Sequence, residues 1–355
     1  MSSAPRQSNF ELLRILAMLA IVLAHVLSEG GGLAHAPAGH LFPALLLGSA
    51  GRLAANVFLV LGCWFLVDAP FRGDRFFSLW ARIFTYTAPI SLAMILCGIA
   101  PWGKDAIRGF LPFFGRPLWF ASAWLSLLVA APFLHGFFAW SRARQRAALI
   151  VFFMLFSFAS TIADFREGYL CDTIWFGYVY LFVGYLKKST GLATGRAWPC
   201  LAAGALVYTA LVAAKFLCVS RGWPGRDLVD RFLIDLKSIP NFFCALATFL
   251  FFARIDLGRN RWINALAKPA FSVYVFHQVP VFFPFLFAGI LRYPAWHGSA
   301  WLLPYSVLAS LAIYAVVLAI DGLRARFVEP LYVRTAAYRA LCAALERFLR
   351  AEERP

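Results

Sequence analysis

Charged residues are scarce in this chain. Its 355 residues include 33 lysines and arginines and 17 aspartates and glutamates, together only 14% of the sequence. A soluble domain carries about a quarter charged residues, so this composition excludes an ordinary soluble protein. Ten-residue segments of alternating hydrophobicity, the signature of a membrane β-barrel, are also missing. Instead, 62% of the residues are hydrophobic, including 37 phenylalanines and 12 tryptophans. This composition predicts an all-α, polytopic integral membrane helix bundle.

Several signatures of chemistry are absent as well. No two of the seven cysteines lie at metal-ligand spacing, so we expect no metal site and no bound cofactor. Nothing resembles a GxSxG elbow, a HExxH helix or a P-loop. No internal repeat suggests an inverted-repeat transporter. The net charge of +16 is spread between apolar segments, so it indicates membrane orientation and not a nucleic-acid partner.

The apolar runs predict about ten transmembrane helices. The expected spans are 10–28, 48–67, 80–100, 118–138, 147–163, 174–187, 199–219, 238–254, 268–290 and 301–321. With a cytoplasmic N-terminus, 22 of the 33 lysines and arginines fall on the inner side and 10 on the outer, with Lys215 mid-helix. This bias predicts that both termini are cytoplasmic and that the number of helices is even. Glu11 and Arg14 interrupt the first apolar run, so we expect a retained helix and not a cleaved signal peptide.

The chain divides into a transmembrane domain, residues 1–334, and a basic tail, residues 335–355. In the tail, Tyr338, Leu341, Leu345 and Phe348 recur at helical spacing opposite several arginines. This pattern is typical of an amphipathic helix that lies on a membrane surface. We expect it to anchor the chain to the inner leaflet without a catalytic role.

Arg14 and His25 are the strongest candidates for a functional site. Eleven residues of helix place both side chains on one face, about 16 Å apart along the axis. An arginine deep in a bilayer costs about 2.5–3.5 kcal/mol, and ionisable groups placed there usually serve a site. An imidazole moves protons near neutral pH, and a guanidinium binds phosphate or carboxylate. The alternatives are a histidine merely hydrogen-bonded within the bundle, and an arginine that snorkels to the headgroups or pairs with Glu11.

Two further groups of polar residues stand out. Arg72, Arg75 and Arg82 follow the second span, where they either grip the phosphates of a nucleotide-like donor or simply obey the positive-inside rule. His277, with Tyr274 one turn earlier and Gln278 beside it, lies in an apolar run and implies a cavity or hydrogen bonds between helices. The other histidines, at positions 35, 40, 135 and 297, fall at loops or helix ends and look ordinary.

The arrangement Glu11-Leu-Leu-Arg14, followed by His25 after ten intervening residues, resembles the opening helix of the membrane acyltransferase 3 family. Further segments resemble the motifs of that family in the same order: Gly62 and Trp64 in its second helix, Arg75 and Arg82 to Pro89 at the start of its third, Leu118-Trp119-Phe120 opening its fourth, Gly184-Tyr185 closing a later one, Tyr274 to His277, and the final Glu329-Pro330. The resemblance covers nearly the whole chain. It departs from the usual second-helix serine and tyrosine at Leu61 and Trp64, which puts any acceptor contact made there in doubt.

This resemblance implies an integral membrane O-acyltransferase that moves an acyl group, commonly acetyl from acetyl-CoA, to a hydroxyl of an envelope or exopolysaccharide sugar. Arg14 would hold the donor, and His25 would act as general base or acyl relay. The other residues expected to bind donor or acceptor are Glu11, Arg72, Arg75, Arg82, Trp119, Tyr274 and His277. The implied partners are acyl-CoA, a carbohydrate or lipid-linked saccharide, membrane lipids and polysaccharide-assembly proteins. The implied location is the bacterial cytoplasmic (inner) membrane.

Two alternatives to an acyltransferase remain. A carrier or flippase of a lipid-linked saccharide also needs many helices and a polar interior, but should have helices broken by Gly or Pro at matching places. A polysaccharide polymerase or ligase should have large outer loops rich in Arg and His, whereas the outer loops expected here are modest.

Overall fold

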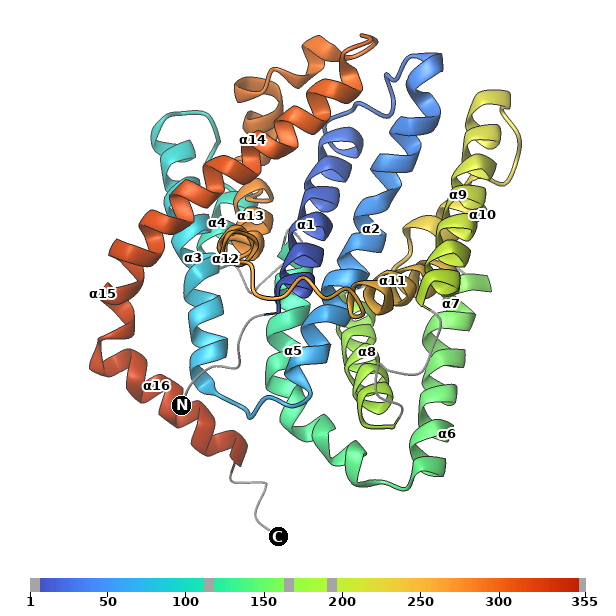
Figure 1. The fold of residues 1–355 in the computed structure, drawn as a ribbon. Helices are drawn as coiled ribbons and strands as arrows, with labels where there is room; N and C mark the ends of the chain where they lie inside the picture. The colour runs from blue at the N-terminus through green and yellow to red at the C-terminus, as the bar shows by residue number, and fades with distance from the viewer. Residues whose placement is uncertain (1–6, 112–117, 163–168, 190–196, 351–355) are drawn as a thin grey trace.

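The fold is built from helices alone within the residues that the structure describes. This computed structural model describes residues 7–111, 118–162, 169–189 and 197–350, and these ranges contain no strand. The longer helices are α1 (Ser8–Ser28), α2 (Ala38–Leu66), α3 (Gly73–Leu96), α5 (Trp119–His135), α6 (Arg142–Phe153), α8 (Tyr169–Ser189), α9 (Ala197–Arg221), α11 (Ile239–Phe252), α14 (Leu302–Leu323) and α16 (Ala336–Arg350). The all-α prediction is confirmed (Figure 1).

Shorter helices and irregular turns connect or extend these elements. The short α-helices are α4 (Lys104–Phe110), α7 (Ala159–Ile162), α10 (Arg226–Ile234), α12 (Arg261–Leu266), α13 (Ala270–His277) and α15 (Glu329–Val333). Single 3-10 turns are η2 (Gly136–Ala139) and η5 (Tyr293–Trp296), and π-helical turns are η3 (Met154–Phe158), η4 (Phe285–Ile290) and η6 (Arg324–Val328).

Seven helical stretches of the described residues are long and apolar enough to cross a membrane, which supports a multi-pass membrane protein. They are Ser8–Ser28, Ala38–Leu66, Gly73–Leu96, Trp119–Ala139, Trp198–Arg221, Arg226–Phe252 and Leu302–Val333. Three expected spans, 147–163, 174–187 and 268–290, are not among them. Residue 163 lies outside the described ranges. The number ten and the side of the membrane that each end faces stay predictions.

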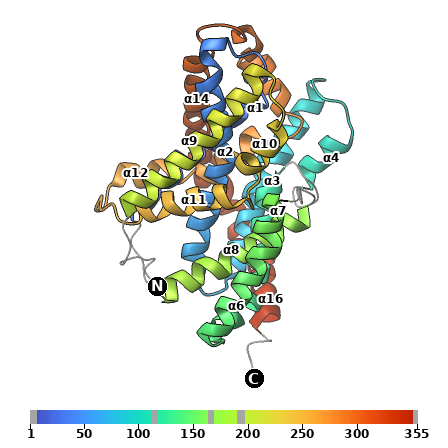
Figure 2. The same ribbon diagram turned by 90° about the vertical axis from the view of Figure 1, so that its right-hand side faces the viewer.

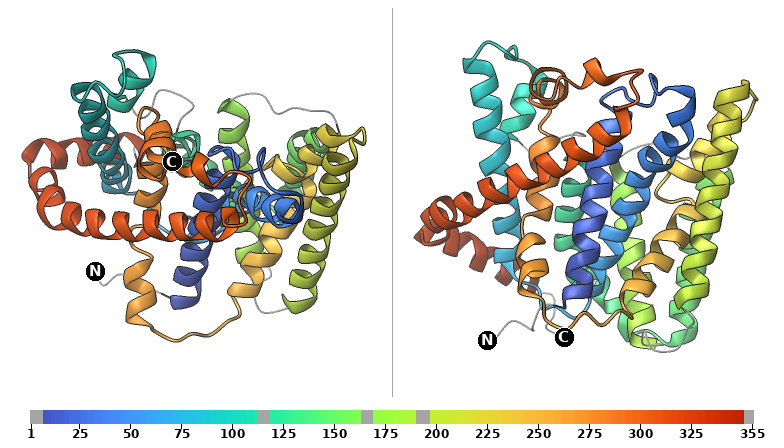
Figure 3. Two further views of the ribbon diagram at one scale, coloured as in Figure 1. Left: turned by 90° about the horizontal axis from the view of Figure 1, so that it is seen from above. Right: turned by 45° about the horizontal axis from the view of Figure 1, so that its top comes forward.

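Helix α1 lies at the centre of the bundle, in contact with α2, α11, α12, α13 and α14 (Figure 3). Its neighbour α2 approaches closely because Gly51 has no side chain. A Cβ at Gly51 would lie 2.5 Å from the Cβ of Ala24, one residue before His25. The polar side chains of α1 therefore face other helices, whereas α9 runs along the flank of the molecule (Figure 2).

The span expected at 268–290 is not one helix, so this part of the prediction is wrong. Helix α13 ends at His277, and regular structure resumes only at residue 283. Pro280 has no backbone N–H to continue the helix, and its ring disfavours helical backbone at the preceding residue, Val279. Because the helix ends at His277, the backbone changes direction there and Gln278 contacts His25 of α1.

A second interruption separates α10 from α11 at residues 235–238 and is held by a buried polar network. The Asn56 amide of α2 donates to the carbonyl of Leu236 at 2.7 Å and to the Asn241 side chain at 2.8 Å. Trp175 of α8 donates to Asn56 at 3.2 Å. These bonds satisfy backbone groups that no helix would satisfy, as lipid-embedded structure requires.

The end of the chain folds back along the bundle. Helix α14 crosses it obliquely, and α16 then lies against the start of α3, at the end of the molecule where α1 begins (Figures 1 and 3). The backbone N–H of Gly73 donates to Glu346 at 2.8 Å. Leu341 and Phe348 stay 53% and 71% exposed. The predicted amphipathic helix is therefore present at 336–350, while residues 351–355 of the expected tail lie outside the described residues.

Candidate active site

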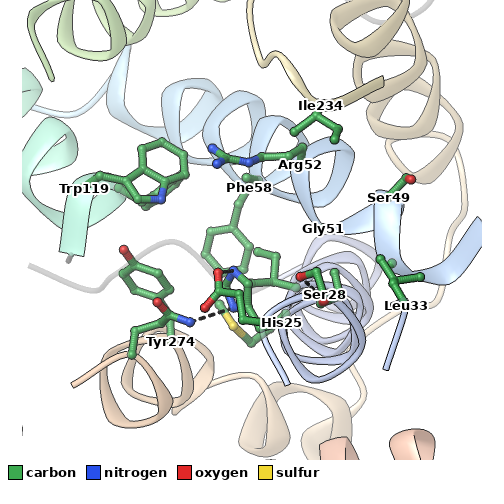
Figure 4. A pocket seen from close by; sticks show the side chains of 18 of the residues that line it. His25, Ser28, Leu33, Ser49, Gly51, Arg52, Phe58, Trp119, Ile234 and Tyr274 are labelled. Carbon is green, nitrogen blue, oxygen red and sulfur yellow. Dashed lines mark hydrogen bonds and ion pairs between the residues drawn. The ribbon is translucent and has the colours of Figure 1, made fainter. Parts of the chain in front are cut away.

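A cavity of about 410 Å³ opens beside the second half of α1 (Figure 4). Residues of α1, α2, α5 and α13 form most of its wall, and Lys215 of α9 and Ile234 of α10 complete it. Along α1 the lining runs from Met18 to Ser28 and continues to Glu29. This volume lies in the range of pockets that enclose small ligands. His25 is the predicted catalytic residue that it contains.

His25 is joined to His277 across the helix interface. The Nδ1 atom of His25 lies 2.9 Å from Nε2 of His277, and the Nδ1 atom of His277 lies 2.6 Å from the carbonyl oxygen of Val273. A carbonyl only accepts, so His277 carries its proton on Nδ1 and its Nε2 is left to accept. His25 must then hold its proton on Nδ1, which leaves a lone pair on its Nε2.

Gln278 and Glu29 complete the surroundings of the His25 ring. The side-chain amide of Gln278 lies 3.0 Å from Nδ1 of His25. The amide atom at this distance is Nε2, which is a donor. Because Nδ1 of His25 already donates to His277, the Gln278 nitrogen cannot donate to it in this tautomer, and the amide instead hydrogen-bonds to the Glu29 side chain. A Glu29 carboxylate oxygen lies 3.8 Å from Nε2 of His25, beyond hydrogen-bonding distance. Burial raises the pKa of Glu29, against the opposing effects of Gln278 and Arg52.

Aromatic side chains form the wall across the cavity from α1. Trp119, at the first turn of α5, lies beneath the guanidinium of Arg52, whose carbon is 5.2 Å from the ring centre. Tyr274 of α13 also lines the cavity; its buried hydroxyl lies near the backbone of Phe120 and Ala121 and donates no hydrogen bond within the described residues. Figure 4 shows Trp119 and Arg52 on one side and His25 on the other. The cavity thus combines an imidazole, a tyrosine hydroxyl and a cation.

Arg14 and Glu11 lie outside this cavity, nearer the start of α1. Nη1 of Arg14 is 2.7 Å from Oε2 of Glu11, so the pairing considered as an alternative from the sequence is present. One such contact leaves other guanidinium N–H groups available. Because α1 is continuous from Ser8 to Ser28, the eleven-residue separation puts Arg14 about 16 Å below His25.

The three arginines after α2 are divided between two places. Arg72 and Arg75 line a second, smaller cavity of about 110 Å³, together with His135, which sequence reasoning regarded as ordinary. Arg72 is also paired with Asp74. Arg82, further along α3, lies instead near Asp321 of α14.

Asp321 is the centre of a buried polar cluster that sequence reasoning missed. It accepts hydrogen bonds from Tyr86 of α3 at 3.0 Å, from Ser272 of α13 at 2.7 Å and from Nε of Arg324 at 2.8 Å. Buried N–H groups on Arg82 (Nε) and Arg324 (Nη1) have no partner in the described part of the chain. The signal available was a lone carboxylate in the apolar run 302–323, since such a residue usually marks a site or a partner.

A comparison with known protein families finds a match over the part of the chain that forms this site. A family model for an acyltransferase domain, that of acyltransferase 3, matches residues 7–321. The chain belongs to the acyltransferase 3 family. The matched region holds both cavities and every predicted site residue and ends at Asp321. No curated protein and no solved structure matches the chain. The recognition made from the Arg14–His25 helix is therefore confirmed, and the protein is a membrane acyltransferase.

The acyltransferase brings together four of the nine residues singled out from the sequence: His25, His277, Tyr274 and Trp119. The other five, Glu11, Arg14, Arg72, Arg75 and Arg82, lie outside the cavity. The charged lining residues that sequence reasoning did not select are Glu29, Arg52 and Lys215, while Gln278 was noted beside His277 but given no role. Leu61 and Trp64, where the chain departs from the family pattern, do not line the cavity beside His25.

Proposed function

We propose that this acyltransferase transfers an acetyl group from acetyl-CoA to a hydroxyl of an envelope or exopolysaccharide sugar, in the bacterial cytoplasmic membrane. The observation that carries the proposal is His25, which lines a ligand-sized cavity with a lone pair on Nε2. A carbohydrate acceptor suits a cavity with an aromatic wall and several hydrogen-bonding side chains. The end of the bundle that carries the start of α1 and α16 would face the cytoplasm, in keeping with the excess of lysine and arginine on that side.

His25 acts as the general base in this proposal. The acceptor hydroxyl gives its proton to Nε2 of His25 while its oxygen attacks the thioester carbonyl of the donor. The tetrahedral intermediate then collapses, the carbon–sulfur bond breaks, and the imidazolium returns the proton to the leaving thiolate. His277 accepts the Nδ1–H of His25 throughout, so it holds the ring in the reactive tautomer. His277 has no exposed surface and acts through His25 as a positioning residue.

Tyr274 is suited to stabilise the charge that develops during attack. Its buried hydroxyl lies near the backbone of Phe120 and Ala121, donates no hydrogen bond within the described residues, and belongs to a side chain that lines the same cavity as His25. A fixed donor aimed at a developing oxyanion is among the strongest contributions that a protein makes to catalysis. We assign Tyr274 this role, next to the base.

The donor reaches His25 from the opposite end of α1. Arg14 lies about 16 Å below His25, a distance that an extended pantetheine arm can bridge. Arg82 and Arg324 offer buried N–H groups without partners among the described residues, and Arg72 and Arg75 line the smaller cavity. Guanidinium groups bind phosphate through paired N–H donors, so these arginines are our candidates for the phosphates of CoA.

The carrier alternative gains one feature from the structure, because two helices are interrupted. Interrupted helices are common at the binding sites of transporters. Here, however, the interruption after His277 sets Gln278 against His25, and the family is one of acyltransferases. A passive carrier needs no imidazole base, so we favour transfer.

The direct experiment measures acetyl transfer from radiolabelled acetyl-CoA in vesicles that contain envelope carbohydrate. Wild type, Arg14→Ala and His25→Ala are compared at equal amounts of folded protein. The expected result is label in the carbohydrate with the wild type and loss of label with either variant. His35→Ala removes an exposed imidazole outside the cavity and should transfer normally. Transfer at the wild-type rate by His25→Ala would refute the assignment of the base.

A further inference from the structure

Arg52 is a charged side chain of the main cavity that forms no ion pair within the described residues. Lys215, the other cation in the lining, pairs with Asp230 at 2.5 Å. The structure gives Arg52 neither an ion pair nor a hydrogen bond within the described residues, although its side chain is exposed to the cavity. The guanidinium instead lies over the ring of Trp119. A cation held in place but unpaired is an open position for an anion.

The contact with Trp119 helps to position the guanidinium. Its carbon lies 5.2 Å from the centre of the Trp119 ring, within the range of a cation–π interaction, and this contact uses none of its five N–H donors in a hydrogen bond. These donors match the two oxygens of a carboxylate or phosphate in a bidentate arrangement. Because Trp119 limits the motion of Arg52, less conformational freedom is lost when a ligand binds.

The position of the one carboxylate in the lining is compatible with an anionic ligand. Glu29 lies on the His25 side of the cavity, 3.8 Å from that ring, and forms no ion pair with Arg52 among the described residues. Burial raises the pKa of Glu29, while Gln278 and Arg52 act in the opposite direction. Lys215 is paired with Asp230, so among the described residues Arg52 is the lysine or arginine of the lining that has no ion pair.

We propose that the acceptor sugar carries an anionic group, a uronate carboxylate or a phosphate, and that Arg52 binds this group while the hydroxyl to be acylated lies at His25. This proposal rests on the proposed transfer to carbohydrate and narrows its acceptor to anionic saccharides. Arg52 is then the residue that determines acceptor specificity. It acts at one end of the cavity, and the base acts at the other (Figure 4).

The test is a binding measurement that does not depend on acyl transfer. Saturation-transfer NMR with the full chain in nanodiscs compares cellobiouronic acid with cellobiose, two disaccharides that differ by a carboxylate in place of a hydroxymethyl group. Glucose 1-phosphate against glucose tests a phosphate in the same way. We expect the wild type to bind the anionic member of at least one pair about tenfold more tightly, as one charge-assisted contact allows.

Variants separate Arg52 from general effects of charge. Arg52→Gln should bind the anionic and neutral sugars with affinities within about twofold. Arg108→Gln makes the same chemical change at an exposed arginine of α4 outside the cavity and should keep the wild-type preference. Which pair shows the preference identifies the carboxylate or the phosphate. Equal affinities in the wild type, binding of none of the sugars, or a preference that survives in Arg52→Gln would overturn the proposal.

The same variants keep this proposal distinct from the proposed function. His25→Ala should keep the anionic preference in binding while transferring no label. Transfer by the wild type to neutral sugars, without any anionic preference, would remove the role of Arg52 and leave the transferase intact. A binding preference without transfer from any acyl-CoA would support the role of Arg52 and refute the proposed transferase function.

Discussion

Replacing His277 by leucine removes the acceptor for the buried Nδ1–H of His25. The two ring nitrogens lie 2.9 Å apart, and His277 is completely buried, so water does not replace the lost partner. Leaving a buried donor unsatisfied costs about 1–3 kcal/mol. The His25 ring escapes that cost by moving its proton to Nε2, which removes the lone pair needed for catalysis. If the same energy is added to the activation barrier of acyl transfer, the rate falls about 5- to 150-fold.

The assay is the single-turnover rate of acetyl transfer at saturating acetyl-CoA, normalised to folded protein. His277→Gln is the matched variant, because a glutamine amide oxygen can take the place of Nε2 and accept from His25. We expect His277→Gln to recover most of the rate lost in His277→Leu. A His277→Leu variant as fast as the wild type would refute the tautomer argument. So would equal losses in the two variants, since a purely structural role would not distinguish an acceptor from a hydrocarbon.

Two further predictions concern packing and pH. Gly51→Ala should destabilise the fold by about 1–3 kcal/mol, because its Cβ would lie 2.5 Å from that of Ala24. Chemical unfolding measures this, with Gly39→Ala, which has open space, as a nearly neutral control. The pKa of Glu29 is raised above its ordinary value of 4.5 by burial, so the folded state holds this proton more tightly and loses stability as pH rises through that pKa. In Glu29→Gln, stability should fall less as the pH rises. Identical profiles of the free energy of unfolding against pH in this variant and the wild type would contradict the prediction.

The sequence by itself determined the class of protein and the chemistry of its first helix. A composition with 14% charged residues leaves no reasonable alternative to a membrane helix bundle, since burial in lipid follows from hydrophobicity alone. The relation between Arg14 and His25 is equally local. It depends only on helix periodicity, and α1 is one uninterrupted helix from Ser8 to Ser28. The pairing of Arg14 with Glu11, three residues earlier, follows from the same spacing.

Only the tertiary structure decided what surrounds His25. His277 lies 252 positions away in the chain, and their contact depends on how α13 packs against α1. The hydrophobic pattern predicts one helix over 268–290. In the structure the helix ends at His277, shortly before Pro280, and the Gln278 amide lies against His25. Arg52 was not selected from the sequence, because no local pattern places it over Trp119. Local spacing fixes which residues share a helix face, but the packing of helices that are distant in the chain, such as α1 and α13, decides which faces meet.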